Sequence, residues 1–205
     1  MEKRSKYERI ARIYDILDLP FEFRRYQPIR REMWTGISGR ILDAGVGTGR
    51  NMTFYPADAQ ITGIDLSPAM LARAEMRRKN LNIKAELVEG DITGTNFPDK
   101  SFDAIVATFL FCVLDAKHQL PALRELARIC HPNGEIHILE YAISADPFRR
   151  LMMKLWAPWV RWAYGASFDR NTEQYVEDAN LDLIETRFLF SDIVKLLILR
   201  PRAAS

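Results

Sequence analysis

Short apolar runs alternate with longer amphipathic stretches through the middle of the chain. This alternation is typical of β-strands joined by α-helices. One helix start is clear, because Ser67 suits the N-cap and Pro68 suits the first helical turn. Connections of this length let neighbouring strands run parallel, so the pattern predicts an α/β fold with a doubly wound, mostly parallel sheet. The predicted strands are residues 40–44, 61–65, 84–88, 103–109 and 135–141, and the run 192–199 is expected to add an antiparallel edge.

Two segments stand outside this alternation. Residues 1–34 precede the first predicted strand and have apolar positions at helical spacing. Residues 146–175 follow the fifth predicted strand, and they hold three of the 4 tryptophans with cations interleaved. No Gly-, Pro- or Ser-rich linker separates either segment from the strands. We therefore expect a single domain over residues 1–205, with an N-terminal amphipathic helical lid and a helical insertion.

The composition fits an ordinary globular domain. The chain has 205 residues, of which 48% are hydrophobic and 27% are charged, and this balance excludes intrinsic disorder. The longest apolar stretch, residues 104–114, is shorter than the roughly 18 residues that span a bilayer. The charged opening residues predict no signal peptide. Cys112 and Cys130 lie in apolar contexts and indicate free thiols in a reducing compartment, so we expect a cytoplasmic protein.

The net charge of +2 is unevenly distributed. Residues 1–31 carry an excess of Lys and Arg over Asp and Glu, and a second basic stretch covers residues 149–170. Neither stretch is dense enough to predict a nucleic-acid partner. Each is either a contact for an anionic surface or a solvated face.

A glycine-rich turn follows the first predicted strand. Its glycines are Gly45, Gly47 and Gly49, whereas a dinucleotide-binding fingerprint would need a glycine at position 50, where Arg50 stands. Small residues in such a turn let the backbone approach a ligand closely. The turn therefore indicates a ligand site, and its spacing argues against NAD.

Acidic residues end or follow three successive strands of the predicted sheet. Asp43 ends the first strand and Asp65 ends the second, twenty residues after Gly45, where an acid can accept hydrogen bonds from both hydroxyls of a ribose. Asp91 follows the third strand, where it could receive an adenine amino group. Ligands of open α/β sheets bind at the carboxyl ends of the strands, so the combination predicts a nucleoside site.

The segment DAGVGTG, Asp65, the Asp91–Ile92 pair and ICHPNGE at 129–135 resemble class I S-adenosylmethionine-dependent methyltransferases over residues 35–145. The resemblance implies a seven-stranded Rossmann-like sheet, with S-adenosylmethionine as cofactor and S-adenosylhomocysteine as product. The N-terminal segment with Tyr14 and Asp15 resembles the helix that caps the cofactor in lipid-quinone and phospholipid methyltransferases. The resemblance implies that residues 1–34 form a lid that lies on a membrane, with Tyr14 at the cofactor, and a helix that only covers the sheet edge is the alternative. Carried over by position, Asp43, Gly45 and Gly47 would surround the methionine moiety, Asp65 the ribose, Leu66 and Met70 the adenosine, Asp91 and Ile92 the adenine, and Thr108 the ligand after the fourth strand.

The methyl acceptor is less well defined by the sequence. The chain as a whole most resembles bacterial phospholipid N-methyltransferases, which convert phosphatidylethanolamine stepwise to phosphatidylcholine. Thiol and quinone methyltransferases are similar too, so a methyltransferase for a small thiol, quinone or other metabolite is the alternative, followed by a non-catalytic binding module. An amine acceptor must present its neutral lone pair to the methyl group. Tyrosine hydroxyls can orient such an amine, and tyrosine faces can hold the cation that methylation produces. The candidate catalytic residues are Tyr26, Tyr141, Tyr175 and, for a phosphodiester, Arg170, each with a packing or surface role as the alternative.

Residues 146–175 suit the headgroup layer of a membrane. Trp156, Trp159 and Trp162 lie close together among basic side chains, and indole and arginine are both favoured at this interface. We therefore expect a phospholipid substrate and an anionic membrane surface as partners, with peripheral association at the inner face of the cell membrane. Packing of the tryptophans in the core or as a pocket lid is the alternative. We expect a monomer without a nucleic-acid partner, and the sequence has no motif with metal-ligand spacing.

Overall fold

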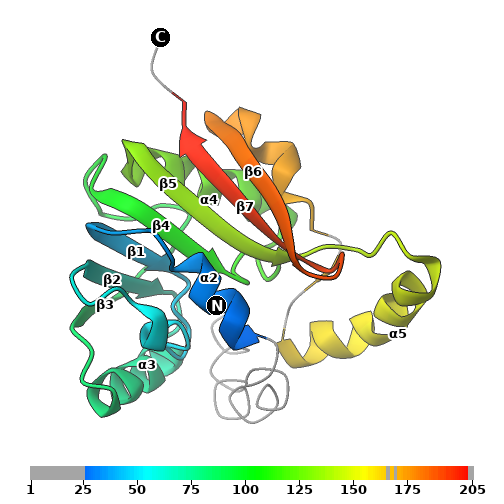
Figure 1. Ribbon diagram of the computed structural model, residues 1–205, viewed down its shortest axis with the longest axis horizontal. Helices are drawn as coiled ribbons and strands as arrows, with labels where there is room; N and C mark the ends of the chain where they lie inside the picture. The colour runs from blue at the N-terminus through cyan, green and yellow to red at the C-terminus, as the bar shows by residue number, and fades with distance from the viewer. Residues whose placement is uncertain (1–25, 165–166, 169, 203–205) are drawn as a thin grey trace.

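A computed structural model describes residues 26–164, 167–168 and 170–202, and within these ranges the chain forms a seven-stranded sheet in the order β3-β2-β1-β4-β5-β7-β6 (Figure 1). The pairings among β1 to β5 are parallel, while β7 runs antiparallel to both β5 and β6. This confirms the predicted doubly wound, mostly parallel α/β sheet. The strands are β1 Arg40–Ala44, β2 Gln60–Asp65, β3 Ala85–Glu89, β4 Phe102–Thr108, β5 Cys130–Tyr141, β6 Leu181–Phe190 and β7 Val194–Pro201.

Helices cover both faces of this sheet, with α2 in front and α4 behind in the view of Figure 1. The start of α3 is as predicted, because the Ser67 side chain accepts a hydrogen bond from the Met70 amide and Pro68 is the first helical residue. The predicted insertion contains α5, a long helix that extends away from the sheet. The helices are α2 Gln27–Met33, α3 Pro68–Asn80, α4 Ala116–Ile129 and α5 Pro147–Tyr164, with short 3-10 turns η2 Met52–Phe54, η3 Thr172–Tyr175 and η4 Glu177–Ala179.

The last strand corrects the predicted sheet edge. The run after residue 192 does form an antiparallel strand, β7, but β6 pairs with its outer side and takes the edge. The reason lies in the side chains, because Leu196, Leu197 and Leu199 are buried on both faces of β7, as in an interior strand. In contrast, β6 exposes Leu183 and Ile184, as an edge strand with one partner does.

The two largest clusters of buried core residues lie on opposite faces of the sheet. On one face, Leu123 and Leu126 of α4 pack in a cluster with buried strand residues such as Ile105. On the other face, Met33 at the end of α2 packs in a cluster with Val106 and other strand residues whose side chains point to that face. Burial on both faces explains why β4 is an apolar run rather than an alternating one. The parallel pairing of β1 to β5 brings their carboxyl ends to one edge of the sheet.

Most of the predicted N-terminal lid lies outside the described residues, and so does the cofactor-binding candidate Tyr14. Its described part is α2, with Tyr26 at the N-cap. None of the described helices is both long enough and apolar enough to cross a bilayer.

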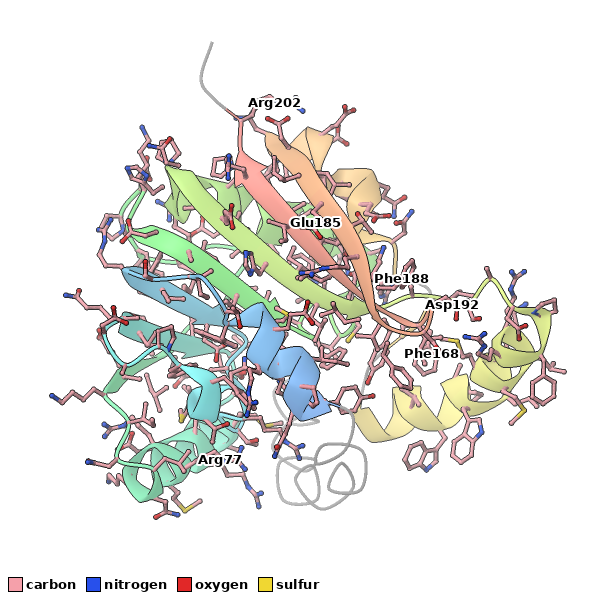
Figure 2. The ribbon with its side chains drawn as sticks, in the orientation of Figure 1. Arg77, Phe168, Glu185, Phe188, Asp192 and Arg202 are labelled. Carbon is pink, nitrogen blue, oxygen red and sulfur yellow. The ribbon has the colours of Figure 1, made fainter. Side chains whose placement is uncertain are left out.

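The insertion is fastened to the sheet where it begins. The Asp192 carboxylate, at the turn between β6 and β7, accepts hydrogen bonds from the Ser144 hydroxyl at 2.6 Å and the Ala145 amide at 2.8 Å. It also accepts one from Arg149 in the first turn of α5 at 2.7 Å. Figure 2 shows Asp192 beside the segment that leads into α5. The direction in which α5 leaves the sheet is therefore set by side-chain contacts.

Candidate active site

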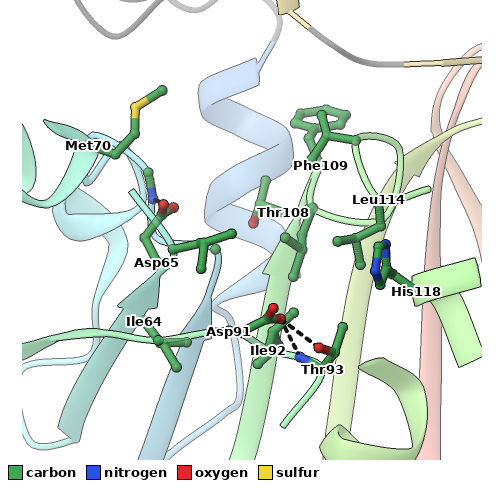
Figure 3. Close-up of a pocket in the computed structure, with 16 residues that line it drawn as sticks. Ile64, Asp65, Met70, Asp91, Ile92, Thr93, Thr108, Phe109, Leu114 and His118 are labelled. Carbon is green, nitrogen blue, oxygen red and sulfur yellow. Dashed lines mark hydrogen bonds between the residues drawn. The ribbon is translucent and has the colours of Figure 1, made fainter. Parts of the chain in front are cut away.

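A cavity of about 190 Å³ lies at the carboxyl ends of β1, β2 and β4 (Figure 3). It is where the strand order reverses around β1, the position at which open α/β sheets bind ligands. Its walls include most of the residues predicted to bind the cofactor, which are Gly45, Gly47, Asp65, Leu66, Met70, Asp91, Ile92 and Thr108.

The glycine turn forms one wall of the cavity. Gly45 and Gly47 have φ of +72° and +55°, in the left-handed region that favours glycine. A Cβ on Gly45 would stand 2.9 Å from the Leu110 side chain, which is too close. The Gly45 and Val46 amides both donate to the Ile64 carbonyl, at 2.9 and 3.0 Å, so β2 holds the turn in place. The turn thus presents bare backbone to a ligand.

Asp65 lies at the end of β2 with its carboxylate already oriented. One oxygen accepts from the Gly47 amide at 2.9 Å and the other from the Ser67 amide at 2.9 Å. Burial raises its pKa, and the backbone hydrogen bonds oppose that change. Each carboxylate oxygen keeps a lone pair for a further donor, so Asp65 fits the two hydroxyls of a ribose.

Asp91 and Ile92 also line the cavity, just after the end of β3. The Asp91 Oδ1 atom accepts from the Thr93 amide at 2.9 Å and from the Thr93 hydroxyl at 2.8 Å, as Figure 3 shows. This turn holds the carboxylate at the rim of the cavity. Ile92 is buried and offers an apolar surface to a flat base. The pair therefore has the acid and the apolar contact that an adenine needs.

His118 also lines the cavity, together with Leu114. It lies in the first turn of α4, and its backbone amide donates to the Asp115 carbonyl at 2.9 Å. Only the packing of α4 behind the sheet brings it here, so no local sequence signal could have found it.

Among the described residues, no group of three or more His, Cys, Asp or Glu is arranged to hold a metal ion.

Asp43 lies beneath the glycine turn and is fully buried, rather than lining the cavity. Asn51 donates to its two oxygens at 2.9 and 3.1 Å, and the Tyr55 hydroxyl donates to Oδ2 at 2.6 Å. Burial raises the pKa of Asp43 to about 6, against the opposing effect of these hydrogen bonds and of the nearby Arg30. As the structure describes it, Asp43 supports the turn from below.

Two of the predicted acceptor residues meet beside Phe109, which is one of the cavity residues. The Tyr26 and Tyr141 hydroxyls are 2.9 Å apart and share a hydrogen bond. Phe109, which lines the cavity, stacks on Tyr141 with ring centroids 4.7 Å apart and meets the edge of Tyr26 at 5.4 Å. Phe168 packs edge-on against Tyr141 at 5.4 Å (Figure 2). We call these four side chains the aromatic cluster.

Phe109 was predicted to end a strand, but β4 ends at Thr108 and Phe109 has a φ of +55°. That backbone conformation turns the chain out of the sheet and places the ring between the cavity and the two tyrosines. The sequence offered no signal for this, because Phe109 continues an apolar run.

The other two acceptor candidates have different surroundings. Arg170 lies near Cys112, and its Nε atom is buried with no hydrogen-bond partner among the described residues. Tyr175 packs on the core cluster behind the sheet, whereas Tyr26 and Tyr141 pack on the cluster in front. The structure therefore brings Tyr26 and Tyr141 together and does not bring Tyr175 to them.

Comparison with known proteins agrees with this site. A family model described as a methyltransferase domain matches residues 41–134. A phosphatidylethanolamine N-methyltransferase of Cereibacter sphaeroides is 37% identical over 105 residues, which are 50% of this chain and 51% of that protein. This chain thus matches about half the length of that relative. A demethylmenaquinone methyltransferase of Tropheryma whipplei is 33% identical over 193 residues, covering 90% of this chain and 78% of that protein.

Solved structures share the fold. A SAM-dependent methyltransferase from Aquifex aeolicus superposes with a TM-score of 0.68 at 18% identity, covering 94% of this chain and 97% of that one. The glycine turn, Asp65 and the Asp91–Ile92 wall form a cavity whose donors and acceptors fit S-adenosylmethionine. The protein belongs to the class I S-adenosylmethionine-dependent methyltransferases and uses S-adenosylmethionine as its cofactor.

Proposed function

We propose that the protein methylates the headgroup amine of phosphatidylethanolamine, stepwise towards phosphatidylcholine, at a membrane surface. The observation that carries this proposal is the aromatic cluster beside the cofactor cavity, with its two tyrosine hydroxyls 2.9 Å apart. Aromatic faces attract a methylated ammonium group, and the attraction does not require hydrogen bonds that methylation would remove. Such a wall can hold the acceptor as methyl groups accumulate.

S-adenosylmethionine supplies an electrophilic methyl group, and the residues around it have to deliver a neutral amine in line with that group. One hydroxyl of the Tyr26–Tyr141 pair donates to the other. The donating oxygen then keeps its lone pairs and can accept an N–H of the amine. Phe109 provides the aromatic face that adjoins the cavity, and its ring stacks on Tyr141. Catalysis in this arrangement comes mainly from proximity and orientation.

Arg170 is the proposed partner of the lipid phosphodiester. A guanidinium binds phosphate oxygens bidentately, and the strength of such charge-assisted bonds exceeds that of neutral ones. The buried Arg170 Nε lacks a hydrogen-bond partner among the residues that the structure describes, which costs about 1–3 kcal/mol. A phosphodiester at this position would offset that cost. Tyr175 has no part in the proposed site, since it packs on the other face of the sheet.

Helix α5 supports a membrane location for the reaction. Its large apolar side chains recur at spacings of three and four and are exposed, with Phe148 72% and Leu155 66% accessible. Arg149, Arg150 and Lys154 are interleaved and exposed as well. An amphipathic helix with aromatic and basic residues binds the interface of an anionic bilayer. The exposed apolar residues of the helix are Phe148, Leu151, Met152, Leu155, Trp156 and Trp159.

A quinone ring is the second candidate acceptor. The demethylmenaquinone methyltransferase of T. whipplei matches this chain over most of its length, whereas the phosphatidylethanolamine N-methyltransferase matches it over half. A flat ring could also stack on Phe109. The two acceptors differ in charge. Only the methylated amine is a cation, so only it is attracted electrostatically to the tyrosine faces.

The test is lipid analysis by mass spectrometry after expression in a bacterium that makes phosphatidylethanolamine but no phosphatidylcholine. We expect mono-, di- and trimethylated headgroups, and none with the Asp65→Ala variant as the inactive control. An unchanged phospholipid profile would refute the proposal, and newly methylated quinones or thiols in the same extract would identify the alternative acceptor.

Membrane binding is tested separately by sedimentation with anionic vesicles. We expect Leu155→Asp to reduce the bound fraction strongly. Ile184→Asp is the matched control, because Ile184 is similarly apolar and exposed but lies on β6. Equal binding of the two variants would exclude α5 as the membrane contact.

A further inference from the structure

Arg30 is a buried cation that the methyl transfer itself does not account for. It lies on α2 with only 8% of its surface exposed. Its Nη1 atom donates to the Asn51 side-chain oxygen at 2.8 Å. Its guanidinium carbon also lies 5.8 Å from the centre of the Phe109 ring, within range of a cation–π contact. Arg30 therefore contacts both the glycine-turn side of the site and the aromatic cluster.

Asn51 extends this connection to the cofactor cavity. Its Nδ2 atom donates to both oxygens of Asp43, at 2.9 and 3.1 Å, and to the Thr108 hydroxyl at 3.2 Å. Asp43 lies under the glycine turn, and Thr108 is part of the cavity wall. One buried amide thus joins α2 to two sides of the cavity.

A second contact joins the C-terminal end of α2 to the same carboxylate, that of Asp43. The Tyr55 hydroxyl donates to Asp43 at 2.6 Å, and the Tyr55 ring packs against Trp34 with centroids 4.6 Å apart. Trp34 directly follows α2, while Tyr26 directly precedes it. The helix is therefore tied to the cavity through Asp43 at one end and carries the acceptor tyrosine at the other.

We propose that Arg30 and Asn51 are positioning residues that couple occupancy of the cofactor cavity to the placement of α2 and of the aromatic cluster. A shift of α2 would leave the Arg30 guanidinium buried without its Asn51 partner, which is unfavourable for a charged group. A cofactor that orders the glycine turn and Thr108 then orders α2 as well. The inference rests on the proposed function only for the identity of the acceptor.

The first test is hydrogen exchange with and without S-adenosylhomocysteine, which needs no acceptor. In the wild-type protein we expect the ligand to slow amide exchange both in residues 45–49 and in α2. In Arg30→Met we expect protection of the turn to remain and the added protection of α2 to disappear. Arg31→Met is the matched control, because Arg31 is the exposed neighbour of Arg30 on the same helix. Ligand-induced protection of α2 that survives in Arg30→Met would overturn the proposal.

The second test separates positioning from binding. On the acceptor that the wild-type protein turns over, we expect Arg30→Met to lower kcat about tenfold to a hundredfold, with KM and the cofactor Kd within about threefold. Arg30→Lys keeps a charge and a donor, so it should recover part of the loss, and it also serves if Arg30→Met does not fold. An unchanged kcat, or an equal loss in cofactor affinity, would refute the positioning role. Failure of phosphatidylethanolamine as an acceptor would appear in the wild-type protein itself and bears only on the proposed function.

Discussion

The buried carboxylate of Asp43 makes the stability of this protein depend on pH in an unusual direction. Burial raises its pKa from the ordinary value of 3.8 to about 6. Between these values the folded protein holds a proton that the unfolded chain has released, so this group's contribution to stability falls as the pH rises. The two values differ by about two pH units, which corresponds to about 3 kcal/mol.

The variant Asp43→Asn removes the charge and keeps nearly the same shape. At pH 4, where Asp43 is protonated in the folded state, we expect the variant to be less stable by about 1 kcal/mol, because one hydrogen bond from Tyr55 or Asn51 is lost. At pH 7 the wild-type protein has ionised a buried carboxyl at a cost of about 3 kcal/mol, and the variant has not. The variant should then be more stable by about 2 kcal/mol.

The assay is urea unfolding followed by tryptophan fluorescence at half-unit steps between pH 4 and pH 7.5. The quantity of interest is the difference between variant and wild type, because Arg78 and Arg128 lower the pKa of Glu75 and Glu125 and give the opposite slope in both proteins. Asp58→Asn, at an exposed position, is the control and should show no such trend. A difference that stays constant across the range would refute the assignment of the slope to Asp43.

Two further predictions concern the ribose contact and the buried ion pair. Asp65→Ala removes a charged acceptor of two ribose hydrogen bonds, so calorimetry should show an S-adenosylmethionine affinity lower by about 2–4 kcal/mol, or roughly 30- to 1,000-fold. Asp58→Ala is its control, and an unchanged affinity in Asp65→Ala would show that the ribose contact is misassigned. Lys195 is buried between Glu140 at 3.2 Å and Glu173 at 3.3 Å. Lys195→Met leaves Glu140 buried without its cation, so unfolding should require about 3–5 kcal/mol less, and a loss below 1 kcal/mol would contradict this account.

The parts of the fold that the sequence predicted are those set by local chemistry. The start of α3 follows from Ser67 and Pro68, whose cap geometry is independent of the rest of the molecule. The glycine turn and Asp65 could be placed because their positions at strand ends determine what they face. The lining of the cavity by Asp65 and Asp91 therefore followed once the parallel strands were recognised.

The parts that it did not predict depend on contacts between distant segments. The edge position of β6 follows from the burial of β7 on both faces. The apolar run that forms β7 is equally compatible with an edge strand, so the sequence did not reveal this order. His118 reaches the cavity only through the packing of α4, and Phe109 only through a positive φ that apolar patterning does not reveal. Tyr175 looked similar to Tyr141 in the sequence, yet Tyr141 ends β5 while Tyr175 lies in the turn η3 and packs on the other face of the sheet.

The insertion that contains α5 is fastened at both of its ends to the same pair of strands. Asp192 beside β7 holds its start, and at its finish the Thr172 hydroxyl bonds to Glu140 of β5, which pairs with Lys195. The stretch between these anchors can therefore be exchanged for another of different length or polarity while the sheet and the cofactor cavity are retained. The chain is in this sense modular, and a graft between Ser144 and Thr172 is a direct route to redirecting the enzyme to a new surface or acceptor.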